Sequence, residues 1–226
     1  MPGVPIGRGR HLVPRTAPAR RLVLTLGALS PAELFDQNAY ANDPRSQFTH
    51  GAFVNDATWD FPQDAHGFSR GGLASYITPR VADVWGLGLN AELGNADRSS
   101  GLFLRLGWKN GATEALASGE ADWSASLGAQ GSGSRWGRRD DAIGLALAWS
   151  ALSRPHARYL EAGGFDPHLG PTGGRSAPER VLEGYYALAA APWTTVSAGA
   201  QVIVTPGADG SRAPVTLLWL RVHLER

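Results

Sequence analysis

The sequence predicts an all-β protein in which antiparallel strands build a transmembrane β-barrel. Three observations predict this fold. Side chains alternate with a period of two in about nine segments, which is typical of β-strands. The second face of these segments holds mainly Gly, Ala and Ser, and tryptophans mark the segment ends. Because single-chain bacterial barrels close with even strand numbers, a count of nine also suggests an incomplete barrel.

The composition excludes several classes of protein. The 226 residues include 21 Lys and Arg against 20 Asp and Glu, so the net charge of +1 indicates no nucleic-acid partner. The absence of cysteine excludes disulfides and thiolate metal sites. No apolar run approaches the roughly 18 residues that a membrane-spanning helix needs, so a helical membrane protein is excluded as well.

The N-terminal part is predicted to differ from the rest of the chain. Residues 1–20 combine basic side chains with four prolines, so we expect a disordered basic tail there and one barrel domain over 21–226. Residues 20–32 fit either a β-strand at 22–27 or a signal peptide, and the short apolar centre, interrupted by Thr25, favours the strand. Residues 30–66 form a long loop rich in Asn, Asp and aromatic residues, a feature that is usually functional when ordered.

The remaining strands follow in order along the chain. The predicted strands are 22–27, 68–77, 84–93, 102–109, 123–130, 143–150, 181–190, 195–204 and 215–224. Leucines occupy one face of most of them, whereas Arg105, Arg221 and His223 fall on the other face. An Arg or Lys at the lipid midplane costs roughly 2–4 kcal/mol, so this separation suits a barrel with an apolar outer face and a polar lumen. Interior glycines weaken a sheet, and their number requires a reason such as close approach of another group.

Tryptophan placement supports the same fold. Trp85, Trp108, Trp123 and Trp149 stand at alternating starts and ends of successive strands, which places all four at one rim, as in an interfacial aromatic girdle. The long connections 109–122, 152–178 and 206–213 share this rim. The shorter 94–100 and 191–192 and the intermediate 131–141 lie at the other. The alternative is that these tryptophans only cover the edges of a soluble sheet.

Several motifs resemble a known family. They are DQNAYANDPRSQF at 36–48, WDFP at 59–62, RWGRRDDAIGLA at 135–146, YLEAGG at 159–164 and TPG at 205–207, with further matches at 67–68, 179–186, 192–193 and 220–223. These segments resemble the carbohydrate-selective porins of the OprB type and follow the family order from about residue 21 to residue 223. The resemblance implies a sixteen-stranded porin of the bacterial outer membrane that allows passive diffusion of sugars and other small solutes.

The resemblance, combined with the strand alternation, gives candidate pore-lining residues. We expect inward-facing solute contacts at Arg70, Arg105, Glu183, Tyr185, Gln201 and Arg221, and a constriction in the 30–66 loop at Asp43, Arg45 and Asp60. Hydroxyl groups of sugars pair with charged side chains, and sugar rings stack on aromatic ones. The alternative for each charged residue is a structural ion pair or cap, and Asp43-Pro44-Arg45 in particular fits turn chemistry. The implied partners are solutes, outer-membrane lipid and further copies of the chain in a homo-oligomer.

The sequence departs from the family in three ways. It is short for the family barrel, the join at 77–84 is abrupt, and it ends Leu224-Glu225-Arg226 where outer-membrane barrels generally end on an aromatic residue. No convincing signal peptide is visible. A shortened or internally deleted member is therefore expected. Because an unclosed barrel leaves costly unpaired backbone groups in lipid, such a chain should not span a membrane alone. A soluble β-sandwich that binds sugar and a non-functional truncated porin remnant remain as alternatives.

An enzyme is not expected. The histidines near acidic residues, such as His50 and His156, lack a metal-ligand spacing of the His-Glu-x-x-His kind. There is no Gly-x-Ser-x-Gly motif and no phosphate-binding glycine loop. The sequence predicts no catalytic residues, no metal site and no cofactor.

Overall fold

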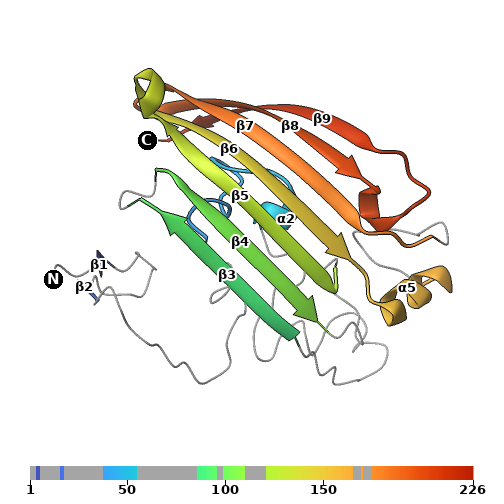
Figure 1. Cartoon of the computed structure of the whole chain (residues 1–226). Helices are drawn as coiled ribbons and strands as arrows, with labels where there is room; N and C mark the ends of the chain where they lie inside the picture. The colour runs from blue at the N-terminus through green and yellow to red at the C-terminus, as the bar shows by residue number, and fades with distance from the viewer. Residues whose placement is uncertain are drawn as a thin grey trace.

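A seven-stranded antiparallel sheet dominates the computed structural model (Figure 1). The structure describes residues 4–5, 16–17, 38–54, 86–95, 99–109, 121–164, 169 and 175–225. The elements are β1 (Val4–Pro5), β2 (Thr16–Ala17), α2 (Gly51–Val54), β3 (Gly86–Gly94), β4 (Gly101–Lys109), β5 (Trp123–Gly133), η1 (Ser134–Trp136), β6 (Arg138–Ala151), α5 (Arg154–Glu161), β7 (Glu179–Ala191), β8 (Thr194–Val204), η2 (Pro206–Ala208) and β9 (Val215–Leu224).

The sheet is a meander in which each strand pairs with the next one along the chain. Its order is β3-β4-β5-β6-β7-β8-β9, every pair is antiparallel, and the sheet is not closed. These seven strands confirm seven of the predicted segments; the predicted strands 22–27 and 68–77 lie outside the described residues. Within residues 1–20, β1 and β2 form a two-residue antiparallel pair.

The predicted connection at 131–141 is wrong. β5 continues to Gly133 and β6 already begins at Arg138, so the single 3-10 turn η1 joins them. Gly137 makes this tight turn possible because its φ of 78° lies in the left-handed region. The pairing then skips from Gly133 opposite Arg138 to Ser132 opposite Ala142, so residues 139–141 bulge out of β6.

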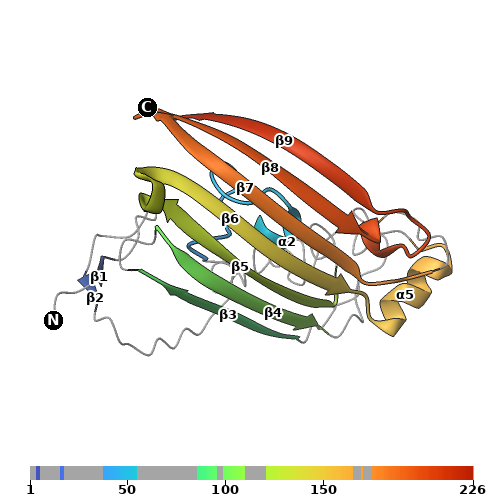
Figure 2. The ribbon, with the colours of Figure 1, turned by 45° about the horizontal axis from the view of Figure 1, so that its top comes forward.

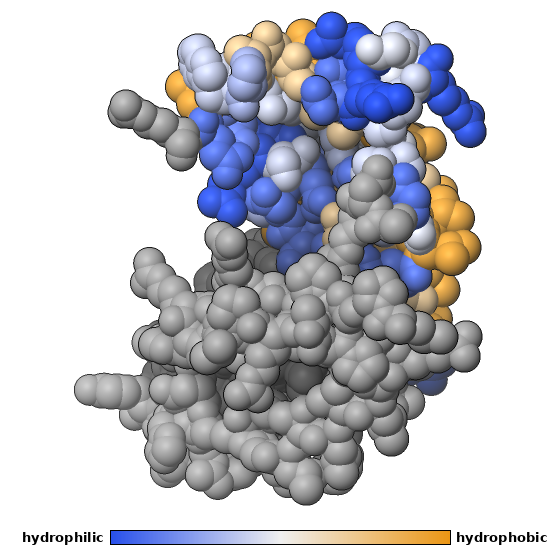
Figure 3. Space-filling view, turned by 90° about the vertical axis from the view of Figure 1, so that its left-hand side faces the viewer, coloured by the Kyte–Doolittle hydropathy of each residue, from blue (hydrophilic) through white to orange (hydrophobic). Residues whose placement is uncertain are grey.

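The polarity of the two faces is the reverse of that in a soluble β-sheet protein, because apolar side chains are exposed and polar ones are buried. The leucine rows are exposed on one face, for example Leu145 at 58% and Leu218 at 81%. The other face buries Arg105, Ser126, Glu183 and Gln201. Figure 3 shows the hydrophobic residues gathered along one side of the described part, with hydrophilic residues on the other. The apolar rows are therefore called the outer face below, and the polar rows the inner face.

The two ends of the sheet differ as the sequence predicts. Trp108 lies directly opposite Trp123, and Trp149 pairs with Ala125 two residues further, so the three tryptophans share one end of the sheet. Trp85 lies outside the described residues. α5 and η2 are at this end, whereas η1 and the C-terminus are at the other (Figure 1). None of the helices in the described part of the chain is long and apolar enough to cross a membrane.

Candidate functional site

Segment 38–54, which ends in α2, lies within the curve of the sheet against its inner face (Figures 1 and 2). Its first residues contact β3, where the Ala39 amide donates to Glu92 Oε2 at 2.9 Å. Its middle reaches β9, where the Arg221 side chain donates to the Pro44 carbonyl. The segment therefore spans the inner face from one edge of the sheet to the other.

An aromatic cluster around Phe48 fastens the segment to the sheet. Phe48 is buried, and its ring centroid lies 5.2 Å from Phe53, 6.0 Å from Phe103 in β4 and 5.0 Å from Tyr185 in β7. The edge-on orientations toward Phe103 and Tyr185 are those that aromatic pairs favour. Phe48 is thus the apolar anchor of the segment.

Glycines on the inner face make room for these rings. A Cβ atom at Gly128 would lie 2.5 Å from Phe103 Cε1, and one at Gly144 would clash with the Tyr185 ring. The close approach of aromatic side chains is therefore the reason for glycine at these two interior strand positions.

Arg105 in β4 holds both ends of the segment. Its Nη1 donates to the Phe53 carbonyl and its Nη2 to the Ala41 carbonyl, each at 2.6 Å. Arg105 is only 1% exposed. A buried guanidinium is costly unless its donors are used, so these two charge-assisted bonds fix the segment firmly against the strand.

Glu183 in β7 holds the middle of the segment. Its Oε1 accepts bonds from the Thr49 amide at 2.7 Å and the Thr49 hydroxyl at 2.9 Å, and its Oε2 accepts the His50 amide at 3.0 Å. Gln201, directly opposite Glu183 in the β7–β8 register, donates from Nε2 to Thr49 Oγ1 at 2.6 Å. Glu183 is fully buried, and the two amides and the Thr49 hydroxyl satisfy its side-chain oxygens.

Arg221 and Tyr185 complete the inner-face contacts. Arg221 Nη1 donates to the carbonyls of Pro44 at 2.5 Å and Gln47 at 3.0 Å, and its guanidinium lies 4.9 Å from the Trp219 ring centroid. The Tyr185 hydroxyl donates to Gln130 Oε1 at 2.9 Å. The side chains that hold the segment therefore bind mainly its backbone atoms; they are Arg105, Glu183 and Arg221.

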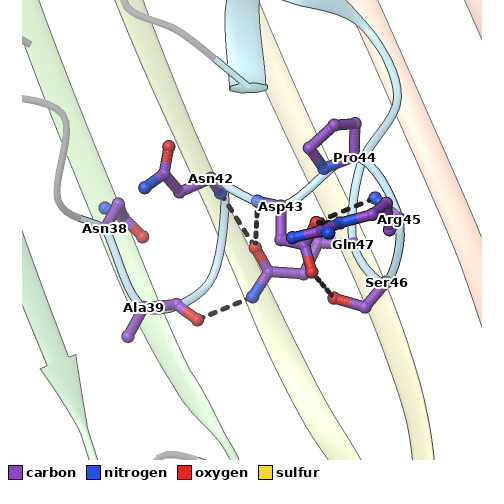
Figure 4. A pocket seen from close by; sticks show the side chains of 8 residues that line it. All are labelled: Asn38, Ala39, Asn42, Asp43, Pro44, Arg45, Ser46 and Gln47. Carbon is purple, nitrogen blue, oxygen red and sulfur yellow. Dashed lines mark hydrogen bonds and ion pairs between the residues drawn. The ribbon is translucent and has the colours of Figure 1, made fainter. Parts of the chain in front are cut away.

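The tip of the segment is a compact turn with an open pocket of about 620 Å³ beside it (Figure 4). The Gln47 amide folds the turn back on itself: Oε1 accepts the amides of Asn42 and Asp43, and Nε2 donates to the Ala39 carbonyl. Asp43 accepts the Arg45 amide at 3.0 Å and pairs with the Arg45 side chain at 3.1 Å. The Arg45 side chain is 77% exposed, so the tip presents its charge to solvent.

Two groups of the segment have shifted pKa values. Burial alone would raise the pKa of Asp43, but bonds from the Arg45 amide, the Ser46 hydroxyl and the Arg45 side chain hold it below its usual value. Burial lowers the pKa of His50, against the opposing effect of the Glu179 and Glu183 carboxylates. His50 Nδ1 also accepts the Ala52 amide at 3.2 Å, which only the neutral ring can do.

A second buried cluster lies at the tryptophan end of the sheet. Asp122 accepts the Ser153 amide at 2.8 Å, lies 3.1 Å from His156 Nδ1 and faces Lys109 Nζ at 3.8 Å. Burial alone would raise the pKa of Asp122, but the bonds from His156 and Ser153 and the charge of Lys109 hold it below its usual value. Ser153 also caps α5 by accepting the His156 amide. The cluster therefore fixes α5 to β4 and β5.

The predicted site residues fall into three groups. Five of them lie on the inner face, and segment 38–54 brings them together: Arg105, Glu183, Tyr185, Gln201 and Arg221. Asp43 and Arg45 lie at the tip of that segment, in the turn that the sequence offers as their alternative explanation. Asp60 and Arg70 lie outside the described residues. Contact of any of these side chains with a solute stays a prediction.

Sequence reasoning missed three residues that pair with this group. Thr49 and His50 donate their amides to Glu183, and Gln130 binds Tyr185. No local signal marks them, because the amides of Thr49 and His50 act through the backbone, which every residue type has. The one available signal was Phe48, an aromatic residue in a polar loop, which indicates attachment to a core.

An open antiparallel sheet with an apolar outer face, a polar inner face and tryptophans at its rim has the features of outer-membrane β-barrels. A family model for the carbohydrate-selective porins of the OprB family matches residues 78–225. The chain belongs to this family, whose members are channel proteins of the bacterial outer membrane.

The chain is also similar to a solved structure, the high-pH structure of OprB from Pseudomonas putida. The two are 19% identical in sequence, with a TM-score of 0.47 over 62% of this chain and 34% of that one. This chain thus spans about a third of the length of that protein. No curated protein matches the sequence.

Proposed function

We propose that the chain forms the wall of an outer-membrane channel through which carbohydrates and other small solutes diffuse passively. In this proposal segment 38–54 narrows the channel, the outer face meets lipid, and no chemical step occurs. The observation that carries the proposal is the inversion of the two faces, combined with a polar segment held against the inner one.

The dimensions of the outer face support membrane insertion. β7, β8 and β9 have 13, 11 and 10 residues. A strand that crosses a membrane in a barrel needs about 9–11 residues at a tilt of about 45°. On β9 the side chains of Leu218, Leu220, Val222 and Leu224 are all exposed on the outer face, as contact with lipid would require.

The candidate pore-lining residues would have two different roles in the channel. Arg105 and Glu183 are buried beneath the segment, so their role is to hold it in place. Asp43 and Arg45 stand at its exposed tip and are the groups that a passing sugar would meet. Weak, exchangeable hydrogen bonds at such a tip favour passage, because a channel must release what it binds. The predicted Asp60 and Arg70 remain part of this proposal.

Closure of the channel requires partners for two strands. β3 and β9 form the edges of the sheet, and unpaired backbone groups cost several kcal/mol each in lipid. Either further strands of the same chain or a second copy would satisfy them, so homo-oligomerisation belongs to the proposal. A soluble β-sandwich instead needs a second sheet over the leucine rows, and the described ranges contain none.

Reconstitution tests the function directly. The refolded chain is added to planar bilayers and to liposomes, and conductance and swelling in mono-, di- and trisaccharide solutions are measured. We expect stepwise conductance and swelling rates that fall with sugar size. A chain that inserts into liposomes but gives neither conductance nor swelling would be a non-functional remnant, and the proposal would be wrong.

A further inference from the structure

One arginine lies on the otherwise uncharged outer face at the tryptophan end of the sheet. Arg180, the second residue of β7, pairs directly with Trp149 in β6 and with Val204 in β8. Its chain neighbour Val181 is buried on the inner face, so Arg180 points outward with Trp149. Arg180 is exposed.

No carboxylate among the described residues neutralises Arg180. The adjacent Glu179 is engaged elsewhere: its Oε2 accepts the Gly207 amide at 2.7 Å, and its Oε1 lies 4.0 Å from His50 Nε2 on the inner side. An outward arginine at the lipid midplane costs about 2–4 kcal/mol but only about 0–1 kcal/mol near the interface. Arg180 therefore belongs at the depth of the lipid headgroups.

The tryptophans place the interface at the same level. Trp149 beside Arg180 is 38% exposed, and Trp123 on the neighbouring strand is 47% exposed, with its ring 5.9 Å from that of Trp108. Exposed indoles gather at the boundary between headgroups and acyl chains. The arginine and the tryptophans thus define one interfacial level by independent criteria.

Among the described residues, the exposed charge at this end is mainly positive. Besides Arg180, the exposed arginines described there are Arg154, Arg158, Arg175 and Arg212, whereas the exposed acidic residue described there is Glu161. The other described carboxylates at this end are buried or half-buried and paired: Asp122 with Lys109 and His156, Asp209 with Arg212 at 3.3 Å, and Glu179 with His50. A surface of this charge attracts anionic headgroups.

We propose that Arg180, with Trp149 beside it, binds the phosphate group of an anionic membrane lipid at the tryptophan end of the sheet. The guanidinium donates to the phosphate oxygens, and the indole packs on the glycerol and upper acyl region. The proposal deepens the proposed function and rests on it, because it requires an inserted sheet.

A unique label next to Arg180 allows a direct test. The chain has no cysteine, so Val204→Cys supplies a single attachment point for a fluorophore on the strand beside Arg180. The labelled chain is refolded into phosphatidylcholine vesicles that contain a few per cent of headgroup-spin-labelled lipid, either phosphatidylglycerol or phosphatidylcholine. Quenching of the label by the two lipids is compared in the parent, in Arg180→Gln, in Arg180→Lys and in the matched control Arg158→Gln.

We expect the parent to favour phosphatidylglycerol about five-fold, the equivalent of the roughly 1 kcal/mol that one basic residue gains at an anionic surface. Arg180→Gln should abolish the preference, Arg180→Lys should keep part of it, and Arg158→Gln should retain it. Equal quenching by both lipids in the parent would overturn the lipid site alone. Equal losses in Arg180→Gln and Arg158→Gln would do the same, because a diffuse charge effect would then explain the preference. A label that neither lipid quenches would show that the sheet is not inserted, and the proposed function would fail with it.

Discussion

The inner and outer faces of the sheet are built from the same strands and follow opposite rules. On β4, Arg105 is buried between Leu104 and Leu106, which are exposed on the other side. Buried polar groups need hydrogen-bond partners, and on the inner face segment 38–54 supplies them. Among the described residues, the outer face has no such partners, and its apolar side chains need none. The difference teaches that the surroundings of each face, and not strand propensity, decide which residues it holds.

The largest effect on folding free energy is expected for a charge placed on the outer face. Leu145→Arg would place a charge in the middle of the leucine rows, and we expect a loss of about 2–4 kcal/mol in folding free energy in vesicles. The matched control is Leu93→Arg at the end of β3, where the expected cost is about 0–1 kcal/mol. Urea titration of both variants in vesicles measures the two costs. Equal costs at the two positions would contradict a lipid-facing band.

The second largest effect is expected on the inner face, where a substitution at Glu183 would weaken the docking of segment 38–54. Glu183→Gln replaces a carboxylate that accepts three hydrogen bonds by an amide whose NH₂ group faces donors. Because bonds to charged groups contribute about 1.5–3 kcal/mol, we expect the docking of segment 38–54 to weaken by about 2 kcal/mol. Limited proteolysis of the segment measures its release, and open-channel conductance should rise in parallel.

Glu92→Gln is the control for this variant. Glu92 is exposed and accepts the Ala39 amide, a bond that an amide oxygen can also accept. The cleavage rate within residues 38–54 should therefore stay close to that of the parent. If Glu92→Gln released the segment as readily as Glu183→Gln, the buried carboxylate would not be its main attachment.

A smaller effect on the docking of segment 38–54 is expected from a change of pH. Burial lowers the pKa of His50 below the value of about 6.5 that it has in the unfolded chain, so the docked segment favours the neutral ring. The docking free energy is then complete above about pH 6.5 and decreases as the pH falls below that value toward the pKa of the docked state. Protease sensitivity of residues 38–54 should increase over this interval, and His50→Asn should remove the change. An identical profile in His50→Asn would assign it to other groups.

The smallest effect is expected at the tip of the segment. Arg45→Gln removes an exposed side chain whose ion pair with Asp43 contributes little in water, so stability should change by less than about 0.5 kcal/mol. Asp43 would then lose the cation that is paired with it at the exposed tip. The reversal potential in a salt gradient should therefore shift toward cation selectivity at unchanged thermal stability. An unaltered reversal potential would place the tip outside the path of ions.

The fold was largely predictable because it depends on a local pattern. Alternation identified all seven strands of the sheet, and it assigned Arg105, Glu183 and Arg221 to the inner face without knowledge of their partners. The tight connection through η1 was missed, since its Gly- and Ser-rich sequence fits a loop as well as a strand.

The candidate site was predictable only in part because it depends on distant contacts. Thr49 meets Glu183 over a separation of 134 residues, and the contact uses a backbone amide that leaves no trace in the sequence. The cluster of Lys109, Asp122 and His156 escaped notice for a similar reason: its members stand on different elements, and no spacing links them.

The attachment of segment 38–54 through main-chain atoms has a consequence for how such a channel can diversify. Arg105 binds the carbonyls of Ala41 and Phe53, Arg221 binds those of Pro44 and Gln47, and Glu183 binds two amides. Most residue types provide these atoms equally well. Exchanges at the tip, such as at Asn42 or Arg45, would therefore leave the fastening intact. The solute selectivity of the channel could therefore change, in evolution or by design, while the contacts that hold segment 38–54 stay the same.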